Sequence, residues 1–373
     1  MTKVVFETAT LADAIKKAAR IAPTRGAAFD KAAGIVLDVS QHPLPCVVRA
    51  TDLDVFSMEW IEPVEMEGDP VAWRLPSISF STVMASLPIG TGKLVTLEEK
   101  ENGHSSQVHL TSGRTKARFN TLDIGYYPEW SAYDPDELYK ANDLGGRFAM
   151  VSWAAGKSDV PLNGVHLTGE IAVATDKYKL CCAPMPIPEL TDPITVPATV
   201  IASMLKATGE VAIGAKGNFL HIMPDEYTQL KAIIYAEKYP GVTRIMQREY
   251  PEKLTVNKEA LLEILNRAAN FAGADRTPTL RCFIGKQEFA VWMPNEEVGM
   301  LGDILDIPGY ADHDRWEVKF TPKYLIEAIS NVPSSEFDMH YDPSNPKRVV
   351  YIDGGSGYEC WVMPRGDIAR SDG

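Results

Sequence analysis

The chain has 373 residues, of which 45% are hydrophobic and 23% are charged, the balance of an ordinary globular protein. Its 50 acidic and 37 basic residues give a net charge of −13, which argues against a surface that binds nucleic acid over its whole extent but is compatible with a basic inner face. No apolar run approaches the roughly 18 residues of a membrane span, and the N-terminus lacks the apolar core of a signal peptide, so we expect a cytoplasmic protein.

The first part of the chain predicts a strand, Val4–Glu7, and then a helix over about residues 11–22. Thr10 and Asp13 occupy capping-box positions at the start of this helix. Apolar residues recur at helical spacing along its length and predict one buried face. Several strands follow, and a second helix begins after Pro76.

The same order of elements then recurs twice. Pro197 and Pro322, like Pro76, stand at the start of a predicted helix, where the missing N–H of proline costs nothing. The spacings are 197−76=121 and 322−197=125 residues, and an Ala-Thr-Asp turn recurs from Ala50 to Ala174, which is 174−50=124 residues. The repeat predicts three similar α+β domains, each with two helices packed on antiparallel sheets. The predicted domains are residues 1–138, 139–250 and 251–373, the last with a polar tail.

The cysteines give no sign of disulfide bonding or of metal binding. They are odd in number and have no CxxC spacing, which favours reduced and mostly buried thiols. The five are Cys46, Cys181, Cys182, Cys282 and Cys360.

Two short motifs resemble catalytic or ligand-binding sequences. Gly90–Lys93 (Gly-Thr-Gly-Lys) has too few residues between its glycines for a phosphate-binding loop, so a plain turn is favoured. Asp312, His313 and Asp314 could ligate a divalent ion in a hydrolase, but no second histidine lies at a suitable offset, and a solvated loop is favoured. We therefore predict no catalytic site, no metal site and no cofactor, and keep the hydrolase as a rival hypothesis.

Basic residues on the predicted helices are a further signal. Alone they are typical of a solvated helix face, but equivalent helices of repeated domains line the same surface of any closed symmetric arrangement. The candidate DNA-binding residues are Lys16, Lys17, Arg20, Arg25, Lys206, Arg267 and Lys323.

A series of short segments also follows a recognisable order. They are Ala50–Leu53, Ser112–Arg114, Phe119–Leu122, Leu162–Val165, Ala174–Asp176, Tyr239–Pro240, Arg244–Ile245 and Val362–Pro364. On a threefold repeat and in this order, they resemble the bacterial-type DNA sliding clamps, the beta subunits of the replicative DNA polymerase III holoenzyme. The resemblance runs from about residue 3 to residue 365, and its divergence is compatible with a phage-encoded member.

The resemblance implies a ring of two chains joined head to tail, with helices around the hole and sheets outside. Double-stranded DNA would pass through the hole without sequence preference, and the protein would be a processivity factor with no catalytic activity. A DNA polymerase and a clamp loader would bind through short linear peptides. The alternative is an interaction scaffold of the same fold that does not encircle DNA.

The resemblance also implies a peptide-binding pocket between the second and third domains. Strand alternation adds Trp361 to the face of Met363, although a buried core is the ordinary interpretation of such aromatic residues. Lys177 and Tyr178 replace the glycine and histidine common in the family, which would narrow and recharge the groove. The expected pocket residues are Leu162, Thr175, Lys177, Tyr178, Leu180, Pro240, Arg244, Ile245, Trp361 and Met363.

Overall fold

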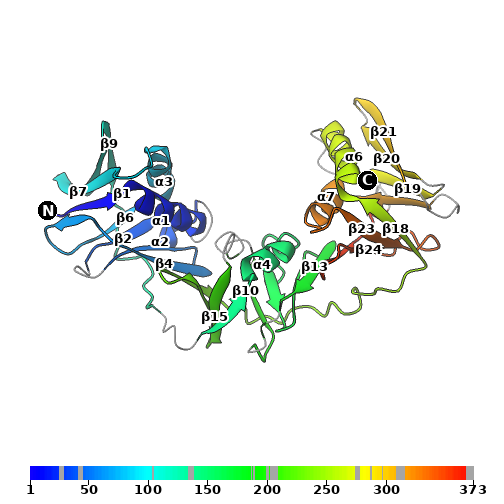
Figure 1. Ribbon diagram of the computed structural model, residues 1–373, viewed down its shortest axis with the longest axis horizontal. Helices are drawn as coiled ribbons and strands as arrows, with labels where there is room; N and C mark the ends of the chain where they lie inside the picture. Colours follow the sequence, from blue (N-terminus) through cyan, green and yellow to red (C-terminus); the bar gives the residue numbers. More distant parts are fainter. Residues whose placement is uncertain are drawn as a thin grey trace, which may run out of the picture. The chain divides into compact units, whose positions relative to one another are not determined.

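In the computed structural model the chain divides into two compact units (Figure 1). Unit 1 comprises Met1–Gly146 and Thr199–Ile234, and unit 2 comprises Arg147–Ala198 and Tyr235–Gly373. The structure describes residues 1–24, 29–40, 45–102, 105–132, 138–185, 187, 190–198, 201, 209–273, 278–285, 288–295, 297–307 and 316–366. Every strand pairing within these residues is antiparallel, in agreement with the predicted α+β class. The division into three domains stays a prediction.

Unit 1 contains two sheets. Its strands are β1 (Lys3–Glu7), β2 (Ile35–Asp38), β3 (Cys46–Thr51), β4 (Val55–Ile61), β5 (Glu65–Glu67), β6 (Ala72–Leu75), β7 (Leu94–Asn102), β8 (Ser105–Ser112), β9 (Thr115–Asn120), β10 (Tyr139–Asn142), β15 (Glu210–Lys216), β16 (Phe219–Asp225) and β17 (Thr228–Ile233). Its helices are α1 (Thr8–Ile21), α2 (Phe29–Ala32) and α3 (Ser77–Ser86). The five-stranded sheet has the order β5-β1-β7-β8-β9, and the eight-stranded sheet has the order β10-β15-β16-β17-β4-β3-β2-β6.

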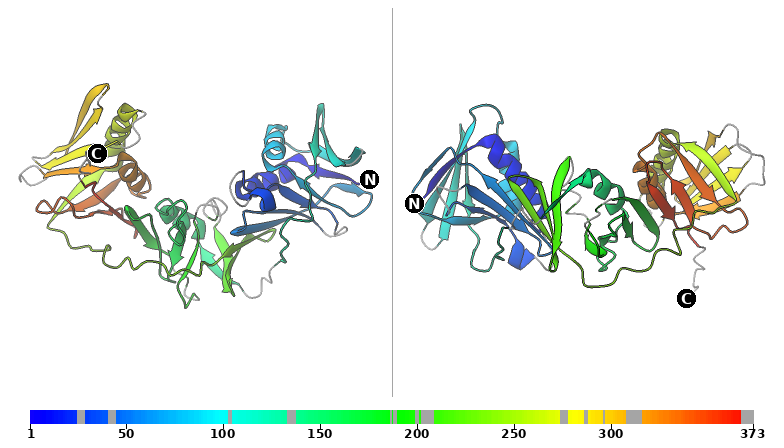
Figure 2. Two further views of the ribbon diagram at one scale, coloured as in Figure 1. Left: turned by 180° about the vertical axis from the view of Figure 1, so that it is seen from behind. Right: turned by 60° about the horizontal axis from the view of Figure 1, so that its bottom comes forward.

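Helix α1 follows strand β1 without a loop. The helix begins at Thr8, so the predicted capping box at Thr10 and Asp13 is wrong, and Glu7 precedes the helix without a side-chain cap. The N–H of Thr8 instead donates to the carbonyl of Lys93 at 2.8 Å, which satisfies one of the free donors of the first turn. The apolar face packs on β3 and β4, and α1 lies beside α3 (Figure 2).

Unit 2 also contains two sheets. Its strands are β11 (Gly164–Leu167), β12 (Ile171–Thr175), β13 (Lys179–Pro184), β14 (Ile194–Pro197), β18 (Glu252–Asn257), β19 (Leu280–Gly285), β20 (Glu288–Asn295), β21 (Gly299–Asp306), β22 (Trp316–Phe320), β23 (Glu336–Tyr341), β24 (Val350–Asp353) and β25 (Glu359–Val362). Its helices are α6 (Lys258–Ala272) and α7 (Pro322–Ser330), together with most of α4 (Leu144–Ser152). The strand orders are β14-β11-β12-β13-β25-β24-β23-β18 and β21-β20-β19-β22.

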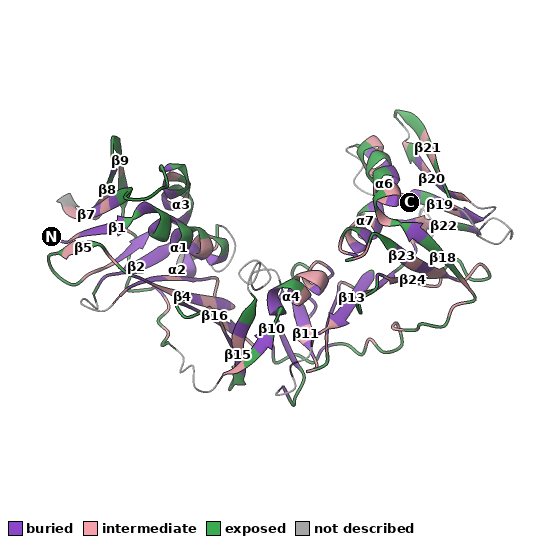
Figure 3. Cartoon of the chain, viewed as in Figure 1, coloured by how far each residue is buried: buried purple, intermediate pink, exposed green. Residues whose placement is uncertain are grey.

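The sequence pattern predicts helices over Lys258–Phe271 and Lys323–Asn331, and α6 and α7 match these bounds to within a residue. The Asn257 side chain caps α6 by accepting a hydrogen bond from the N–H of Ala260 at 3.0 Å, and Gly273 ends it with a φ of +59°. Pro322 lies in the first turn of α7, as predicted. The two helices pack against each other, and each shows a buried and an exposed side in Figure 3. The predicted helix after Pro197 lies almost entirely outside the described residues.

The predicted Ala-Thr-Asp repeat forms the same hairpin turn twice. Between β3 and β4, the Thr51 hydroxyl accepts a hydrogen bond from the N–H of Leu53 at 2.9 Å. A carboxylate oxygen of Asp52 accepts from the N–H groups of Asp54 and Val55 at 3.0 and 2.7 Å. Leu53 has a φ of +80°, and these side-chain hydrogen bonds hold it in the left-handed region.

Between β12 and β13 the arrangement repeats atom for atom. The Thr175 hydroxyl accepts from the N–H of Lys177 at 3.2 Å, and Lys177 also has a φ of +80°. Asp176 accepts from the N–H groups of Tyr178 and Lys179, both at 3.0 Å. The spacing seen in the sequence is therefore a structural repeat.

The strand that follows each turn pairs with a strand from a distant part of the chain. In unit 1, β4 pairs with β17, so that Phe56 lies opposite Lys231. In unit 2, β13 pairs with β25, so that Leu180 lies opposite Trp361. Each eight-stranded sheet is therefore assembled from stretches that lie far apart in the sequence.

The structure confirms that the cysteines are buried thiols and that Gly90–Lys93 is a plain turn. All five cysteines are free and buried, and burial raises the pKa of the Cys46 thiol to about 11. Gly90–Lys93 is a turn between α3 and β7, in which the N–H of Lys93 donates to the carbonyl of Gly90 at 3.1 Å. No helix among the described residues is long and apolar enough to cross a membrane.

Candidate functional site

Unit 2 contains a cavity of about 390 Å³ beside the turn between β12 and β13. Its walls come from the loop after α4, from this turn and from the first two turns of α7. Three aromatic rings and one buried cation dominate the lining. They are Trp153, Tyr178, Tyr324 and Lys179.

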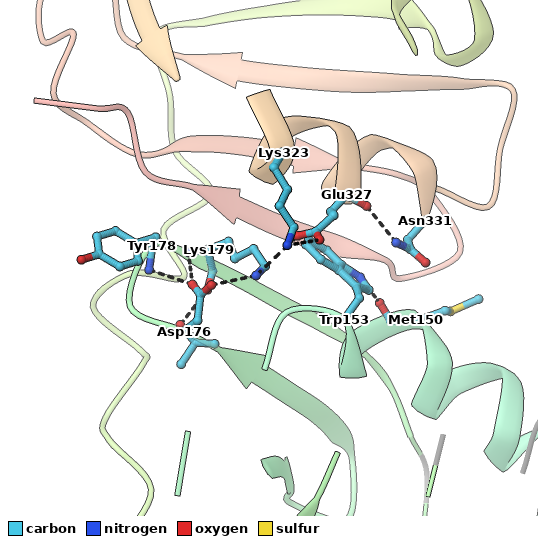
Figure 4. A network of polar contacts seen from close by, with 9 residues as sticks. Met150, Trp153, Asp176, Tyr178, Lys179, Lys323, Glu327 and Asn331 are labelled. Carbon is cyan, nitrogen blue, oxygen red and sulfur yellow. Dashed lines mark hydrogen bonds and ion pairs between the residues drawn. The ribbon is translucent and has the colours of Figure 1, made fainter. Parts of the chain in front are cut away.

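Lys179 is the central polar group of this cavity (Figure 4). Its side chain is only 6% exposed, and its ammonium lies 2.7 Å from a carboxylate oxygen of Asp176 and 3.5 Å from one of Glu327. The same ammonium lies 5.6 Å from the centre of the Trp153 ring and 5.1 Å from that of Tyr324. Two carboxylates and two ring faces together compensate the loss of water around the charge.

Neighbouring contacts hold these partners in place. The indole N–H of Trp153 donates to the carbonyl of Met150 at 2.6 Å. The side-chain amide of Asn331 donates to the carbonyl of Glu327 at 2.8 Å. Lys179 thus connects the turn after β12 to helix α7 through fixed groups on both sides.

The rim of the cavity is aromatic and charged. The ring of Tyr178, which is 57% exposed, stacks on Tyr324 with centroids 5.9 Å apart and an interplanar angle of 14°. Lys177 is exposed and pairs with Asp159 at 3.3 Å. The rim therefore offers a flat aromatic surface next to paired charges, and the expectation that Lys177 and Tyr178 narrow and recharge a peptide groove stays a prediction.

An apolar cluster lies on the other face of the same sheet region. Its buried members include Leu162, Leu180 and Trp361, and the extended segment 239–246 packs against them. The indole N–H of Trp361 donates to the carbonyl of Gln247 at 2.9 Å, which anchors the end of that segment. The cluster is Leu162, Val173, Leu180, Cys182, Tyr239, Tyr351 and Trp361, with Ile171, Val242, Ile245, Met246, Tyr250 and Val349 packed on it.

The structure thus brings four of the ten predicted pocket residues into one cluster, namely Leu162, Leu180, Ile245 and Trp361. Trp361 is 1% exposed, so it belongs to the core under the pocket and not to its accessible wall. The ordinary interpretation of this aromatic residue was therefore the better one.

The other predicted pocket residues surround this cluster or the turn. The Thr175 hydroxyl donates to the carbonyl of Lys179 at 2.7 Å inside the turn. The N–H of Met363 donates to the carbonyl of Tyr178 at 2.8 Å, and its side chain is 38% exposed. Pro240 and Arg244 are exposed on the covering segment.

Sequence reasoning missed Trp153, Lys179, Tyr324 and Glu327 as site residues. The signal for Lys179 was local, because it follows Asp176 by three residues in a turn that orients both side chains. Glu327 and Tyr324 come from α7, about 145 residues further on, and no local pattern connects them to the turn.

Comparisons with known proteins concern the chain as a whole, and no family model matches it. The chain is 22% identical over 336 residues to the beta sliding clamp of Caulobacter vibrioides, covering 83% of this chain and 86% of that protein. It is 20% identical over 352 residues to the beta sliding clamp of Staphylococcus aureus, covering 89% of this chain and 90% of that protein.

Solved structures give the same result for the fold. The DNA polymerase III beta subunit of Thermotoga maritima superposes with a TM-score of 0.81 at 18% identity, covering 98% of this chain and all of that one. The DNA polymerase sliding clamp of Bacillus subtilis superposes with a TM-score of 0.78 at 17% identity, covering 98% and 99%. Both comparisons point to the bacterial beta sliding clamps. The α+β clamp fold that the sequence motifs implied is confirmed.

The basic residues expected to face DNA in a beta clamp lie on α1, α6 and α7. Lys16 and Arg20 are exposed on α1. Lys17, on the same helix, is 29% exposed and lies 2.8 Å from Glu59 and 3.0 Å from Asp13. Burial lowers the pKa of Lys17, but these two carboxylates outweigh it and raise the pKa overall.

Two other basic candidates are also paired. Arg267 on α6 lies 2.7 Å from Asp303, and Lys323 on α7 lies 3.5 Å from Glu327. Among the described candidates, Lys17, Arg267 and Lys323 therefore carry a charge that is partly compensated inside the molecule. Arg25 and Lys206 lie outside the described residues.

The hydrolase hypothesis also falls on residues outside those described, Asp312, His313 and Asp314. Within the part of the chain that is described, no group of three or more metal-binding side chains comes together. The cavity of unit 2 instead has the chemistry of a recognition site, with aromatic rings, paired charges and an apolar neighbour.

Proposed function

We propose that this chain is a DNA sliding clamp, a processivity factor that encircles duplex DNA as a head-to-tail homodimer. It requires neither a catalytic group nor a cofactor. Its partners are double-stranded DNA without sequence preference, a DNA polymerase and a clamp loader. The expected location is the cytoplasm, because DNA replication takes place in the bacterial cytoplasm.

The observation that carries the proposal is the repeated way in which the sheets are joined. Strand β4, which follows one Thr-Asp turn, pairs with β17, and β13, which follows the other, pairs with β25. Strand β21 likewise follows a hairpin turn, where Asn295 accepts from the N–H groups of Glu297 and Val298 at 3.0 and 3.1 Å. Yet β21 ends its sheet, with β20 as its one neighbour in the described part of the chain.

The strand that would complete this third junction is β9. It is the last strand of the five-stranded sheet, as β17 and β25 are the last strands of the repeats that follow, and it also lies at an edge. An edge strand presents unpaired N–H and C=O groups to another chain. Pairing β9 of one copy with β21 of another repeats the two junctions already present inside the chain, and two such contacts close a ring.

The side chains of these two edges are complementary. Lys116 and Arg118 are exposed along β9, and Arg114 is exposed in the turn just before it. Strand β21 has Asp306 exposed at its end and exposes Met300 and Ile304, which are 60% and 53% accessible. Two exposed apolar side chains on an edge strand mark a candidate interface, and the basic residues of β9 together with Asp306 would orient the partner.

DNA would be held by enclosure. Each phosphate neutralised by a fixed Lys or Arg adds affinity and salt dependence, so many fixed contacts would stop sliding. The exposed Lys16 and Arg20 on α1, together with the partly compensated Lys17 and Arg267, suit loose contact with a moving duplex. The overall charge of −13 discourages DNA from binding to the remaining surface.

The aromatic cavity and the apolar cluster of unit 2 support the second part of the function, which is to hold linear peptides of the polymerase and the loader. The exposed Met363, Tyr178 and Pro240 offer apolar contacts, while the paired charges of Lys177 and Lys179 leave the site close to neutral. A peptide would therefore bind mainly by apolar contact, with the carboxylates and lysines setting its orientation.

Retention on circular and linear DNA tests the proposal. The protein is assembled on nicked circular DNA, separated from free protein by gel filtration at moderate salt, and the circle is then cut at one site. A clamp stays on the circle and is lost after cutting. Equal retention on both forms contradicts encirclement, and a monomer in sedimentation at micromolar concentration favours the scaffold alternative.

A further inference from the structure

Unit 1 contains a counterpart of the unit 2 peptide site, built from the same parts. The Thr-Asp turn recurs at Thr51 and Asp52 with the same hydrogen bonds as at Thr175 and Asp176. The strand after the turn again pairs with the last strand of the following repeat, as β4 pairs with β17. The counterpart of Leu180 on this strand is Phe56.

A Tyr-Pro step completes the correspondence. Tyr127 and Pro128 follow the first Thr-Asp turn, and Tyr239 and Pro240 follow the second one. Both phenols are buried. In both cases burial raises the pKa of the phenol. The chain segment that follows each repeat therefore contains the same Tyr-Pro step with a buried tyrosine.

The two faces differ in how they are covered. In unit 2, Leu180 and Trp361 are buried under segment 239–246. In unit 1, the rings of Phe56, Trp130 and Phe219 are each only partly buried. Phe56 lies 5.1 Å from Trp130 and 6.4 Å from Phe219, both edge to face, so the three rings form one continuous surface.

This aromatic surface also carries a cation. Lys231 occupies the position opposite Phe56 that Trp361 occupies opposite Leu180. Its ammonium lies 3.9 Å from the centre of the Phe219 ring. No carboxylate among the described residues forms an ion pair with Lys231, which leaves its charge available to a ligand.

We propose that the surface formed by Phe56, Trp130, Phe219 and Lys231 is a second binding site for a short linear peptide that carries an acidic residue next to an aromatic or branched aliphatic one. The apolar side chain of the peptide lies against Phe56 and Trp130, and its carboxylate pairs with Lys231. The choice of a peptide as the occupant rests on the proposed function, because the unit 2 site has the same plan. The requirement for an acidic residue is specific to unit 1 and follows from Lys231, which forms no ion pair with the described carboxylates.

A binding stoichiometry tests this proposal. The probe is a fluorescein-labelled peptide Ser-Gly-Asp-Leu-Phe-Ser, titrated into the full chain by calorimetry and by fluorescence anisotropy. We expect two sites per chain in the wild type. Lys231→Glu should weaken one of them about tenfold or more, because it replaces an attraction by a repulsion. Met363→Asp should remove the other. A probe with Lys in place of Asp should bind only the unit 2 site.

Lys140→Glu is the matched control, since Lys140 lies on β10 of the same sheet and is exposed. It should leave both sites intact. A benzophenone-labelled probe gives a second measurement, and its cross-links, mapped by mass spectrometry, should include peptides that contain Phe56 or Trp130.

The outcomes separate the two proposals. One site per chain that is lost in Met363→Asp and unchanged in Lys231→Glu, with cross-links confined to unit 2, overturns the second site and leaves the proposed function standing. If Lys231→Glu abolishes binding and Met363→Asp has no effect, the site in unit 1 stands and the peptide pocket proposed in unit 2 is overturned.

Discussion

Leu180 and Trp361 face each other directly across β13 and β25, and both are almost completely buried. One strand follows the Thr175 turn and the other is the last strand of the described chain. The pair therefore joins two parts of the sequence that are 361−180=181 residues apart. The proposed peptide site of unit 2 surrounds this junction, so its shape would depend on the packing of these two side chains.

Trp361→Ala should destabilise the protein strongly. Removal of a fully buried indole leaves a cavity and an unpaired carbonyl at Gln247, and buried Trp→Ala changes cost about 3–5 kcal/mol in the free energy of unfolding. Urea denaturation followed by circular dichroism measures the change. Tyr178→Ala, which removes an exposed ring from the same site, is the control and should cost about 1 kcal/mol or less. Equal effects of the two variants would contradict the assignment of Trp361 to the core.

Lys179→Met should be costly although methionine matches the length of lysine. It leaves Asp176 and Glu327 without their shared cation, and removing one partner of a buried pair costs about 3–5 kcal/mol. Thermal denaturation at constant ionic strength measures the loss. Lys177→Met removes an exposed pair two residues away and should change stability by less than about 1 kcal/mol. The double change Lys179→Met with Glu327→Gln should recover part of the loss.

Glu359 should make stability depend on pH in the acid range. Burial opposes its ionisation, but hydrogen bonds from Arg248 and Tyr351 prevail and lower its pKa. A carboxylate with a depressed pKa stabilises the fold fully above the ordinary glutamate value of about 4.3, and this contribution is lost as the pH falls through the lower folded pKa. The stability difference between the wild type and Glu359→Gln should therefore shrink as the pH falls from 5.5 to 3. A difference that stays constant over this range would show that the ion pair with Arg248 contributes nothing.

Ile304→Lys should dissociate the proposed dimer without unfolding the chain. Ile304 is exposed on β21, so the folded monomer tolerates the change, whereas a lysine there would meet the basic residues of β9 in the partner. Sedimentation equilibrium should show monomers for this variant and dimers for the wild type. Val298→Lys, in the turn before β21, is the control for an added charge. Dimerisation that survives Ile304→Lys would place the interface elsewhere.

Lys16→Glu with Arg20→Glu should weaken the contact between the clamp and DNA while the ring remains closed. Both residues are exposed on α1, and each lost phosphate contact reduces the slope of log affinity against log salt by about 0.9. Retention on nicked circular DNA at increasing salt measures the effect. Lys253→Glu, on β18 and paired with Asp338, should have little influence on retention. A salt slope that does not change would remove α1 from the DNA-facing surface.

Much of the fold could be predicted from local patterns. The periodicity of α1, α6 and α7 reflects the apolar face that each helix buries, and the Thr-Asp turns follow from side chains that bond their own backbone. The start of α1 was missed because the carbonyl that satisfies Thr8 comes from Lys93, far along the chain. A capping box is a local signal and carries no information about such a partner.

The site was harder to predict for the same reason. Leu162, Leu180 and Ile245 could be placed together through the family resemblance, while the sandwich of Lys179 between Trp153 and Tyr324 depends on α4 and α7 coming together. The apolar character of Trp361 suited either a pocket wall or a core. Only the packing of segment 239–246 over it decides between them.

The long-range strand pairs also have a consequence for biosynthesis. Strand β4 leaves the ribosome well before β17, its partner, because Phe56 and Lys231 are 231−56=175 residues apart. Strand β13 is likewise synthesised long before β25, since the paired residues Leu180 and Trp361 are 361−180=181 residues apart. The sheet of unit 2 therefore stays incomplete, with the edge of β13 unpaired, until translation is nearly over, and nascent chains of this protein should depend on chaperones that shield such an edge more than the stability of the finished molecule suggests.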